Sequence, residues 1–411
     1  MARRQKSMGE KWDHLRDVLE FQLPVPKGEG EAVENIRARN RRRAFAARTV
    51  YVLALVALCA LLARSLVSRH AYSGYEMLSV RNVADNVSNY RYFNGRLLRY
   101  SQDGLSLLDT DLAALWSQAY DITQPVAAVS GNVAAIYDRR GTRVRVFNEE
   151  GEIGAFGTEL PILAARVSGA GNVVAALENG DYTKLVYYTP NGEVIAELAE
   201  DAGREEQVAA FAVSEDGKTI AVAYFGNYDT ASGTRLVFYD FSAAGQELED
   251  HVAFAEEEKY KNNLVPYIQA IPGGFLVVRD NGFSIYPGNG SQGESVDVAF
   301  NGKILSVVQG DDCIGFVFDG ENEEHRYRME IYGYDGRRRA DFPVDIAYDR
   351  VSITEGGVVF TNGTEMAVYT LDGFCTYHGK LEEGTIFDVI RIGPNRYFLV
   401  TDMRAGLFRL K

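Results

Sequence analysis

Two groups of side chains in this sequence carry the aromatic, acidic and imidazole chemistry with which protein surfaces bind ligands. The groups are Tyr224, Tyr228 and Asp229, and Glu323, Glu324 and His325. Tyrosine supplies apolar area with a polar tip, and carboxylates and imidazole supply hydrogen bonds. The chain contains no His-Glu-x-x-His, Gly-x-Ser-x-Gly or Cys-x-x-Cys motif for hydrolysis or metal binding. We therefore predict that these residues bind a ligand, and we expect no catalytic residue, metal or cofactor.

Both groups lie in a repeated β unit. After residue 70, runs of β-branched, aromatic and small apolar residues alternate with Asp-Gly and Asn-Gly pairs, which favour tight hairpins. One phrase recurs about eight times, as in VAAIYDRRGTRVRVFNEEGE (133–152) and VVAALENGDYTKLVYYTPNGE (173–193). The copies are spaced 37–51 residues apart, and a period of about 40–50 residues with four short strands is typical of a β-propeller.

The two ends of the repeat indicate how the ring closes. The last copy supplies only three strands, at 387–392, 397–401 and 406–410, and one isolated strand at 76–83 precedes the first full copy. That strand can complete the last blade and so remove two unpaired sheet edges. The sequence therefore predicts an all-β, eight-bladed β-propeller, with seven blades as the alternative because the spacing is unequal.

The candidate binding residues lie on the two longest connections between second and third strands, residues 225–234 in the fourth copy and 319–328 in the sixth, with Tyr224 directly before the first of them. Equivalent connections emerge on one face of a propeller, so we expect both loops there, flanking the fifth blade. The turns on the opposite rim are short, at Asn191-Gly192, Asp335-Gly336 and Asp372-Gly373. Insertions confined to one face are typical of a binding face. The alternative is that both loops are only solvated surface.

A hydrophobic segment precedes the repeat. Residues 50–63 are fourteen consecutive apolar residues, and residues 49–67 approach the ~20 residues that a helix needs to cross ~30 Å of hydrocarbon. The 48 residues before the segment argue against a cleaved signal peptide, and the segment lacks the polar face of a core helix. We predict a transmembrane signal anchor at 49–67.

The charges around this segment predict its orientation. Its N-terminal flank contains Arg37, Arg39, Arg41, Arg42, Arg43 and Arg48, and its other flank only Arg64 and Arg69. Because arginines favour the cytoplasmic side, we expect a cytoplasmic stub at 1–48, with an amphipathic helix at 10–22, and an extracytoplasmic propeller at 68–411. Of the net charge of −14, residues 1–67 carry +6 and the rest −20. An acidic propeller argues against nucleic acid as a partner.

Only two cysteines, Cys313 and Cys375, follow the hydrophobic segment. A domain of this length can bury a core without a disulfide. The sequence leaves open whether the two are bridged or free.

With its short stub, single anchor and β units such as VAAIYDRRGTRVRVFNEEGE, the chain resembles the bacterial single-pass membrane proteins of a propeller family of unknown function. The resemblance covers residues 40–411 and implies no established activity. A looser similarity, at Leu115-Trp116 before Ser117, is to the eight-bladed quinoprotein-like propellers. That family has such a tryptophan in most blades, whereas Trp116 is the only one here after the stub.

The sequence therefore favours a binding or scaffold module at the cell membrane, in which the propeller face recognises a protein, a peptide or a cell-envelope polymer. The alternative is an enzyme, such as a hydrolase, lyase or oxidoreductase, with a site in the central channel. The residues that face the channel would distinguish the two, because an enzyme needs convergent carboxylates or histidines there.

Overall fold

The computed structural model of the chain describes residues 49–50, 52–56, 70–82, 88–198, 206–228, 231–290, 293–322, 325–354 and 356–411. The chain divides into two compact units, residues 1–68 and 69–411. In the first unit, residues 49–50 and 52–56 are helical. Within the described ranges, no helix has both the length and the apolar character needed to cross a membrane. The predicted helix at 10–22 and most of the predicted anchor lie outside these ranges.

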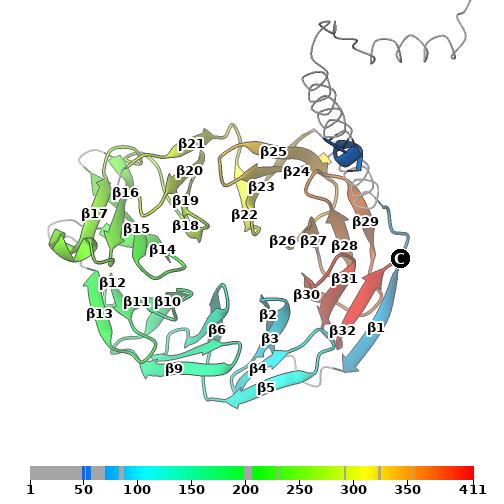
Figure 1. Ribbon diagram of the computed structural model, residues 1–411, viewed down its shortest axis with the longest axis horizontal. Helices are drawn as coiled ribbons and strands as arrows, with labels where there is room; N and C mark the ends of the chain where they lie inside the picture. Colours follow the sequence, from blue (N-terminus) through cyan, green and yellow to red (C-terminus); the bar gives the residue numbers. More distant parts are fainter. Residues whose placement is uncertain are drawn as a thin grey trace, which may run out of the picture. The chain divides into compact units, whose positions relative to one another are not determined.

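The second unit consists of eight four-stranded antiparallel sheets around a central axis, an eight-bladed β-propeller (Figure 1). The innermost strands are β2 (Asn89–Phe93), β6 (Pro125–Ser130), β10 (Ile162–Val167), β14 (Glu206–Val213), β18 (Tyr267–Ile271), β22 (Ile304–Gln309), β26 (Arg350–Thr354) and β30 (Ile386–Arg391). The second strands are β3 (Arg96–Tyr100), β7 (Val133–Asp138), β11 (Val173–Asn179), β15 (Thr219–Tyr228), β19 (Gly274–Arg279), β23 (Cys313–Asn322), β27 (Gly357–Thr361) and β31 (Arg396–Thr401).

The outer half of each blade follows the same order. The third strands are β4 (Gly104–Leu108), β8 (Arg143–Asn148), β12 (Tyr182–Tyr188), β16 (Ala231–Asp240), β20 (Gly282–Pro287), β24 (His325–Gly333), β28 (Glu365–Tyr369) and β32 (Arg404–Leu410). The outermost strands are β5 (Ala114–Ala119), β9 (Gly151–Gly157), β13 (Val194–Leu198), β17 (Val252–Glu256), β21 (Val296–Ala299), β25 (Arg338–Val344), β29 (Cys375–Lys380) and β1 (Tyr75–Asn82). Two short 3-10 helices, η1 (Gly245–Glu247) and η2 (Glu249–His251), precede β17. The predicted eight blades are confirmed, and the seven-bladed alternative is wrong.

The hydrophobic core is divided among the eight seams between neighbouring blades. Successive side chains of a strand point to opposite faces. In β7, Val133, Ala135 and Tyr137 pack toward the following blade, and Ala134 and Ile136 pack toward the preceding one. Because both faces of such a strand are buried, its sequence is a continuous apolar run rather than a strict alternation of polar and apolar residues.

The ring closes by pairing the two ends of the propeller. Strand β1 lies antiparallel to β32, from Tyr75 opposite Leu410 to Asn82 opposite Arg404, so the last blade contains both ends of the domain. A hydrophobic cluster that includes Leu97 and Phe398 then joins this blade to the first complete one. The closure predicted from the isolated strand is confirmed, with the strand beginning one residue earlier.

The two connections predicted as loops, 225–234 and 319–328, are wrong as loops, because most of their residues are paired. Strands β15, β16 and β23 have 10 residues each and β24 has 9, against five to seven in the second and third strands of the other blades. The pairing continues to Tyr228 opposite Ala231 and to Asn322 opposite His325. Beyond the ends of the neighbouring strands, the two hairpins do not pack against other strands. Their residues are therefore polar or glycine and lack the apolar pattern by which a strand is recognised in sequence.

The short turns on the opposite rim are confirmed. Gly192, Gly336 and Gly373 each follow a third strand and have φ of 87°, 76° and 88°. This left-handed conformation is open to glycine at little cost, whereas residues with a Cβ rarely adopt it. The turns can therefore remain tight in all three blades.

The two cysteines of the propeller are free thiols. Cys313 is 1% exposed, and burial raises its pKa to about 11. The uncharged thiol is a poor nucleophile, so Cys313 acts as a small apolar residue of the core.

The fold predicts that Gly406, on β32 opposite Val80, is needed to close the ring. A Cβ at this position would collide with the backbone carbonyl oxygen of Ser79 in β1. We expect Gly406→Ala to lower the free energy of unfolding by about 1–3 kcal/mol in urea denaturation of the detergent-solubilised chain. In the control Gly74→Ala, the added Cβ meets no atom within 4 Å, so the change should stay within about 0.5 kcal/mol. Equal stability of the two variants would contradict this role.

Candidate functional site

The first predicted binding residue, Tyr224, lies at the base of the hairpin formed by β15 and β16 and has no exposed surface. Its hydroxyl is 2.9 Å from the hydroxyl of Tyr239, and the guanidinium of Arg235 lies 4.9 Å from the centre of its ring. Tyr224 therefore supports the hairpin from the core and does not face a ligand. The sequence pattern alone assigns Tyr224 to a loop, because it does not show that the strands of the hairpin are paired at this position.

A buried ion pair fixes the same hairpin base. The guanidinium of Arg235 donates to both carboxylate oxygens of Glu206, with Nη2 2.6 Å from Oε2 and Nε 3.1 Å from Oε1. The Glu206 side chain is 1% exposed. Burial alone would lower the pKa of Arg235, but the hydrogen bonds and charge of Glu206 raise it above the ordinary value. Such a two-pronged pair holds a fixed geometry and favours a rigid hairpin.

The hairpin formed by β23 and β24 has a related base around the buried carboxylate of Glu330. Arg328 Nη2 lies 3.1 Å and Arg338 Nη1 3.3 Å from Glu330 Oε1, and the Tyr332 hydroxyl donates to the other oxygen. Each hairpin base therefore contains a buried acidic side chain held by arginine, Glu206 from the inner strand β14 in the first and Glu330 from β24 itself in the second.

The other predicted binding residues belong to the two hairpin tips. The backbones of Tyr228 and His325 are paired in the last rungs of their ladders, and their side chains are not described. Asp229, Glu323 and Glu324 lie outside the described residues. Their role in ligand contact stays a prediction, while the shared position of the two tips follows from the fold.

A cavity of about 420 Å³ lies in the channel wall and crosses four successive inner strands, β22, β26, β30 and β2. We call it the charged cavity, and its lining residues are Arg91, Ser306, Val307, Tyr348, Asp349, Arg350, Val351, Ser352, Val359, Thr361, Asp388 and Val389. A cavity of this volume is within the range of small-ligand sites. None of these residues was predicted as a site residue from the sequence.

The charges of the cavity come from three inner strands. Arg350 on β26 lies 3.4 Å from Asp388 on β30, and Arg91 comes from β2. Burial raises the pKa of Asp388, and the charges of Arg350 and Arg91 offset only part of that rise. Beside them, the hydroxyls of Ser306 and Tyr348 are 2.8 Å apart. The cavity thus combines guanidinium groups, hydroxyls and a carboxyl group that protonates more readily than usual.

The charged cavity and the two long hairpins belong to the same face of the propeller. The strands of a blade are antiparallel, so an inner strand begins on the face where the second and third strands turn. Arg350 is the first residue of β26, and Ser306, Asp388 and Arg91 are each the third residue of their strands. Arg350, Ser306 and Asp388 therefore lie toward the hairpin face, and Arg91 lies at the middle of β2. A smaller cavity of about 70 Å³, lined by Ile353, Thr354 and Arg391 among others, lies toward the opposite end of these strands.

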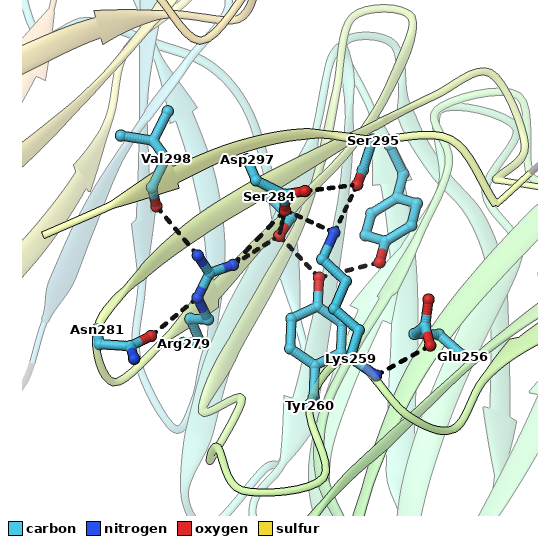
Figure 2. A network of polar contacts seen from close by, with 10 residues as sticks. Glu256, Lys259, Tyr260, Arg279, Asn281, Ser284, Ser295, Asp297 and Val298 are labelled. Atoms are coloured by element: carbon cyan, nitrogen blue, oxygen red, sulfur yellow. Dashed lines mark hydrogen bonds and ion pairs between the residues drawn. The ribbon is translucent and has the colours of Figure 1, made fainter.

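Figure 2 shows a second polar cluster, in which Tyr260, Arg279 and Asp297 converge on Ser284. The Ser284 hydroxyl accepts from Tyr260 (2.8 Å) and Arg279 (2.9 Å) and donates to Asp297 (2.5 Å). Ser284 has no exposed surface, so it cannot reach a substrate. Burial raises the pKa of Tyr260 to about 12. The cluster is therefore a structural junction between β20, β21 and the connection that leads into β18.

That connection also contacts the first long hairpin. Thr234 of β16 is fully buried, and its hydroxyl donates to the carbonyl of Asn263 (2.9 Å) and accepts from the amide of Val265 (3.1 Å). Lys259 extends the cluster at the other end, where its Nζ lies 2.5 Å from Asp297. The hairpin is thus tied to the polar cluster of the fifth blade as well as to its own sheet.

Residues 68–409 match a family of unknown function, DUF5711. The chain belongs to that family, which confirms the predicted propeller family of unknown function, while the single-pass membrane anchor stays a prediction. A search of curated proteins found no match.

Solved propellers resemble the structure at low sequence identity. BamB from Moraxella catarrhalis is 10% identical, with 82% of this chain and 100% of that chain covered and a TM-score of 0.50. A eukaryotic initiation factor is 13% identical, with 80% and 87% covered and a TM-score of 0.51. The Dos1 propeller is 11% identical, with 82% and 95% covered and a TM-score of 0.50. At these identities the likeness concerns the fold alone.

The polar cluster leads to a stability prediction. Ser284→Ala removes one hydroxyl and leaves Tyr260, Arg279 and Asp297 each one partner short, and of these Tyr260 has no exposed surface. We expect the free energy of unfolding to fall by about 1–3 kcal/mol in urea denaturation. Ser101→Ala, which removes an exposed hydroxyl that only caps a turn, should change it by about 0.5 kcal/mol or less. A Ser284→Ala variant as stable as this control would show that the cluster contributes little.

Proposed function

We propose that the protein is a membrane-anchored extracytoplasmic propeller that binds a protein, a peptide or a cell-envelope polymer on its hairpin face. The observation that carries this proposal is the coincidence of two features on one face, the two extended hairpins and the charged cavity. Both hairpins exceed the usual strand length by about four residues, or roughly 13 Å at ~3.3 Å per residue.

The rigidity of the hairpin bases supports recognition of a large partner. Ordering flexible loops on binding costs free energy, whereas a hairpin that is already paired binds without that cost. Arg235 with Glu206, and Arg328 with Glu330, hold the two bases from within the core. The two hairpins belong to the blades on either side of the fifth blade, so one extended partner can contact both.

The membrane anchor and the orientation are supported by sequence. Residues 49–67 have the length and apolar character of a spanning helix, and the arginines on the N-terminal flank favour the cytoplasm. The acidic charge of the propeller suits an extracytoplasmic location, where no anionic inner leaflet repels it.

Shortening the hairpins tests the binding face. Residues 227–232, and separately 320–326, would be replaced by Asn-Gly, which closes a two-residue turn on the remaining ladder. Gly226 opposite Gly233, and Asp319 opposite Tyr327, then become the last rungs, and both buried bases are kept. We expect a drop of roughly tenfold or more in partner affinity, since a binding hot spot contributes about 2 kcal/mol or more.

Affinity would be measured by pull-down and by cosedimentation with cell-envelope material, with the full chain solubilised from membranes. Arg337→Ala is the matched control, because this side chain is 87% exposed on a turn of the opposite face. Equal recovery of partners with the shortened hairpins and with the control would contradict the assigned face.

Cysteine labelling tests the topology. In the variant Arg337→Cys, the new thiol should react in intact cells with a maleimide that cannot cross membranes, since the position is well exposed. Ser7→Cys, in the stub, should react only after the cells are permeabilised. The unmodified chain, in which Cys313 is buried, gives the background labelling. The reverse pattern of labelling would show that the orientation is inverted.

A further inference from the structure

We propose that the charged cavity binds a carboxylate attached to an apolar group, with the carboxylate held by Arg350 and Arg91 and the apolar group against Leu305 and Phe387. This inference rests on the proposed binding face and names the chemistry that the face recognises. It is carried by the charges of the cavity, by its apolar neighbours and by the position of Asp388.

The first step concerns the guanidinium groups. The propeller unit is strongly acidic, yet two arginines line one cavity in its channel. Among the described residues, Arg350 pairs with Asp388, whereas Arg91 has no ion-pair partner and is exposed. Arginine presents a planar set of donors that matches a carboxylate in two-pronged geometry. The cavity therefore contains one guanidinium outside any ion pair, that of Arg91, and a second, that of Arg350, which is paired with Asp388.

The second step concerns the charge that the cavity accepts. Its lining contains Arg91 and Arg350 together with Asp349 and Asp388, which balance when all are ionised. Protonation of Asp388 gives the lining one net positive charge. A singly charged carboxylate is matched by this charge, whereas a doubly charged phosphate is left with an excess negative charge in an acidic domain. With Asp388 protonated, the cavity thus favours a carboxylate over a phosphate.

The third step concerns the apolar neighbours. A β-bulge interrupts β22 between Ile304 and Ser306, and another interrupts β30 at the equivalent place, between Ile386 and Asp388. The extra residues, Leu305 and Phe387, are 39% and 43% exposed. The inner strands β10 and β14 have a bulge at the same place, so β22 and β30 are distinguished by the exposed large apolar side chain that their bulges present. Each exposed apolar residue is one position, about 3.3 Å along the strand, from a residue that lines the cavity.

The fourth step concerns pH. Asp388 faces Arg350 of β26 and Arg91 of β2, with Asp349 and Tyr348 from the connection that precedes β26. At high pH its carboxylate competes for Arg350 and repels the ligand. As pH falls through its raised pKa, Asp388 becomes neutral and frees Arg350, so affinity should increase. The ligand itself stays ionised above about pH 4.5.

Calorimetric titration of the detergent-solubilised full chain tests the inference. The probes are N-acetylphenylalanine, its uncharged amide, inorganic phosphate, and a tetrapeptide that ends in phenylalanine with a free carboxylate. We expect saturable binding of the acid, at least about tenfold weaker binding of the amide, and weaker binding of phosphate than of the acid. Tighter binding of the tetrapeptide than of N-acetylphenylalanine would identify a peptide C-terminus as the source of the carboxylate, and equal binding a free acid.

The variants Arg350→Gln and Arg91→Gln should each weaken binding of the acid about tenfold or more. Asp388→Asn should strengthen binding at high pH and abolish the increase in affinity that otherwise accompanies a fall in pH. Arg409→Gln is the matched control. Arg409 Nη2 lies 3.3 Å from Glu76 Oε2 on the outer strands β32 and β1, and neither residue lines the cavity. Thermal melting of each variant shows whether it folds, and Leu305→Gln probes the apolar side without changing any charge.

Equal binding of the acid and the amide, tighter binding of phosphate, or unchanged affinity in both arginine variants would overturn the inference. The outcomes separate it from the proposed function. Loss of the partner on hairpin shortening together with no binding of N-acetylphenylalanine would refute only the carboxylate site. Binding of the acid with full retention of the partner by the shortened hairpins would refute only the hairpin contact.

Discussion

The structure depends on the burial of the middle strands on both of their faces. In β7, every residue is buried, with alternate side chains in two different seam cores. A single blade would expose both of these faces, so its stability comes from two neighbours rather than from its own hydrogen bonds. In a closed ring, every blade has both of its faces covered by neighbouring blades, but only if the last seam forms. The pairing of β1 with β32, which builds the blade on one side of that seam, therefore affects all of the others.

Ring closure also assembles the charged cavity. Arg350 and Asp388 come from the last two blades in the chain, whereas Arg91 comes from the first complete one. More than 250 residues separate Arg91 from Arg350 in sequence, and they share a cavity only because the ring closes. The exposed bulge residues Leu305 and Phe387 add local apolar surface on the strands to either side of β26. The fold thus couples the closing interaction to the site that we propose as functional.

The sequence predicted the ring well and the site poorly, for physical reasons. A middle strand such as β11 is an apolar run bounded by turn residues, because it is buried on both faces, and this pattern repeats. The inner strand β2, with the sequence NYRYF, faces the channel on one side and has no such pattern. Arg91 is therefore inconspicuous until the ring is built. The signal that could have found it is a charged residue at the third position of inner strands, as at Arg91 and Asp388.

Two acidic residues of the propeller show how the same fold makes one carboxylate structural and another available. Burial alone would raise the pKa of Asp297, but hydrogen bonds from Lys259 and Ser284 lower it below its usual value. Asp388 is also partly buried. Burial raises its pKa even though Arg350 lies 3.4 Å away. The protonation state of a carboxylate with a full set of hydrogen bonds and ion pairs changes little when a ligand binds. The protonation state of a poorly compensated carboxylate responds more strongly to a neighbouring charge. For this reason we place the proposed ligand in the cavity around Asp388 rather than at the denser cluster around Ser284.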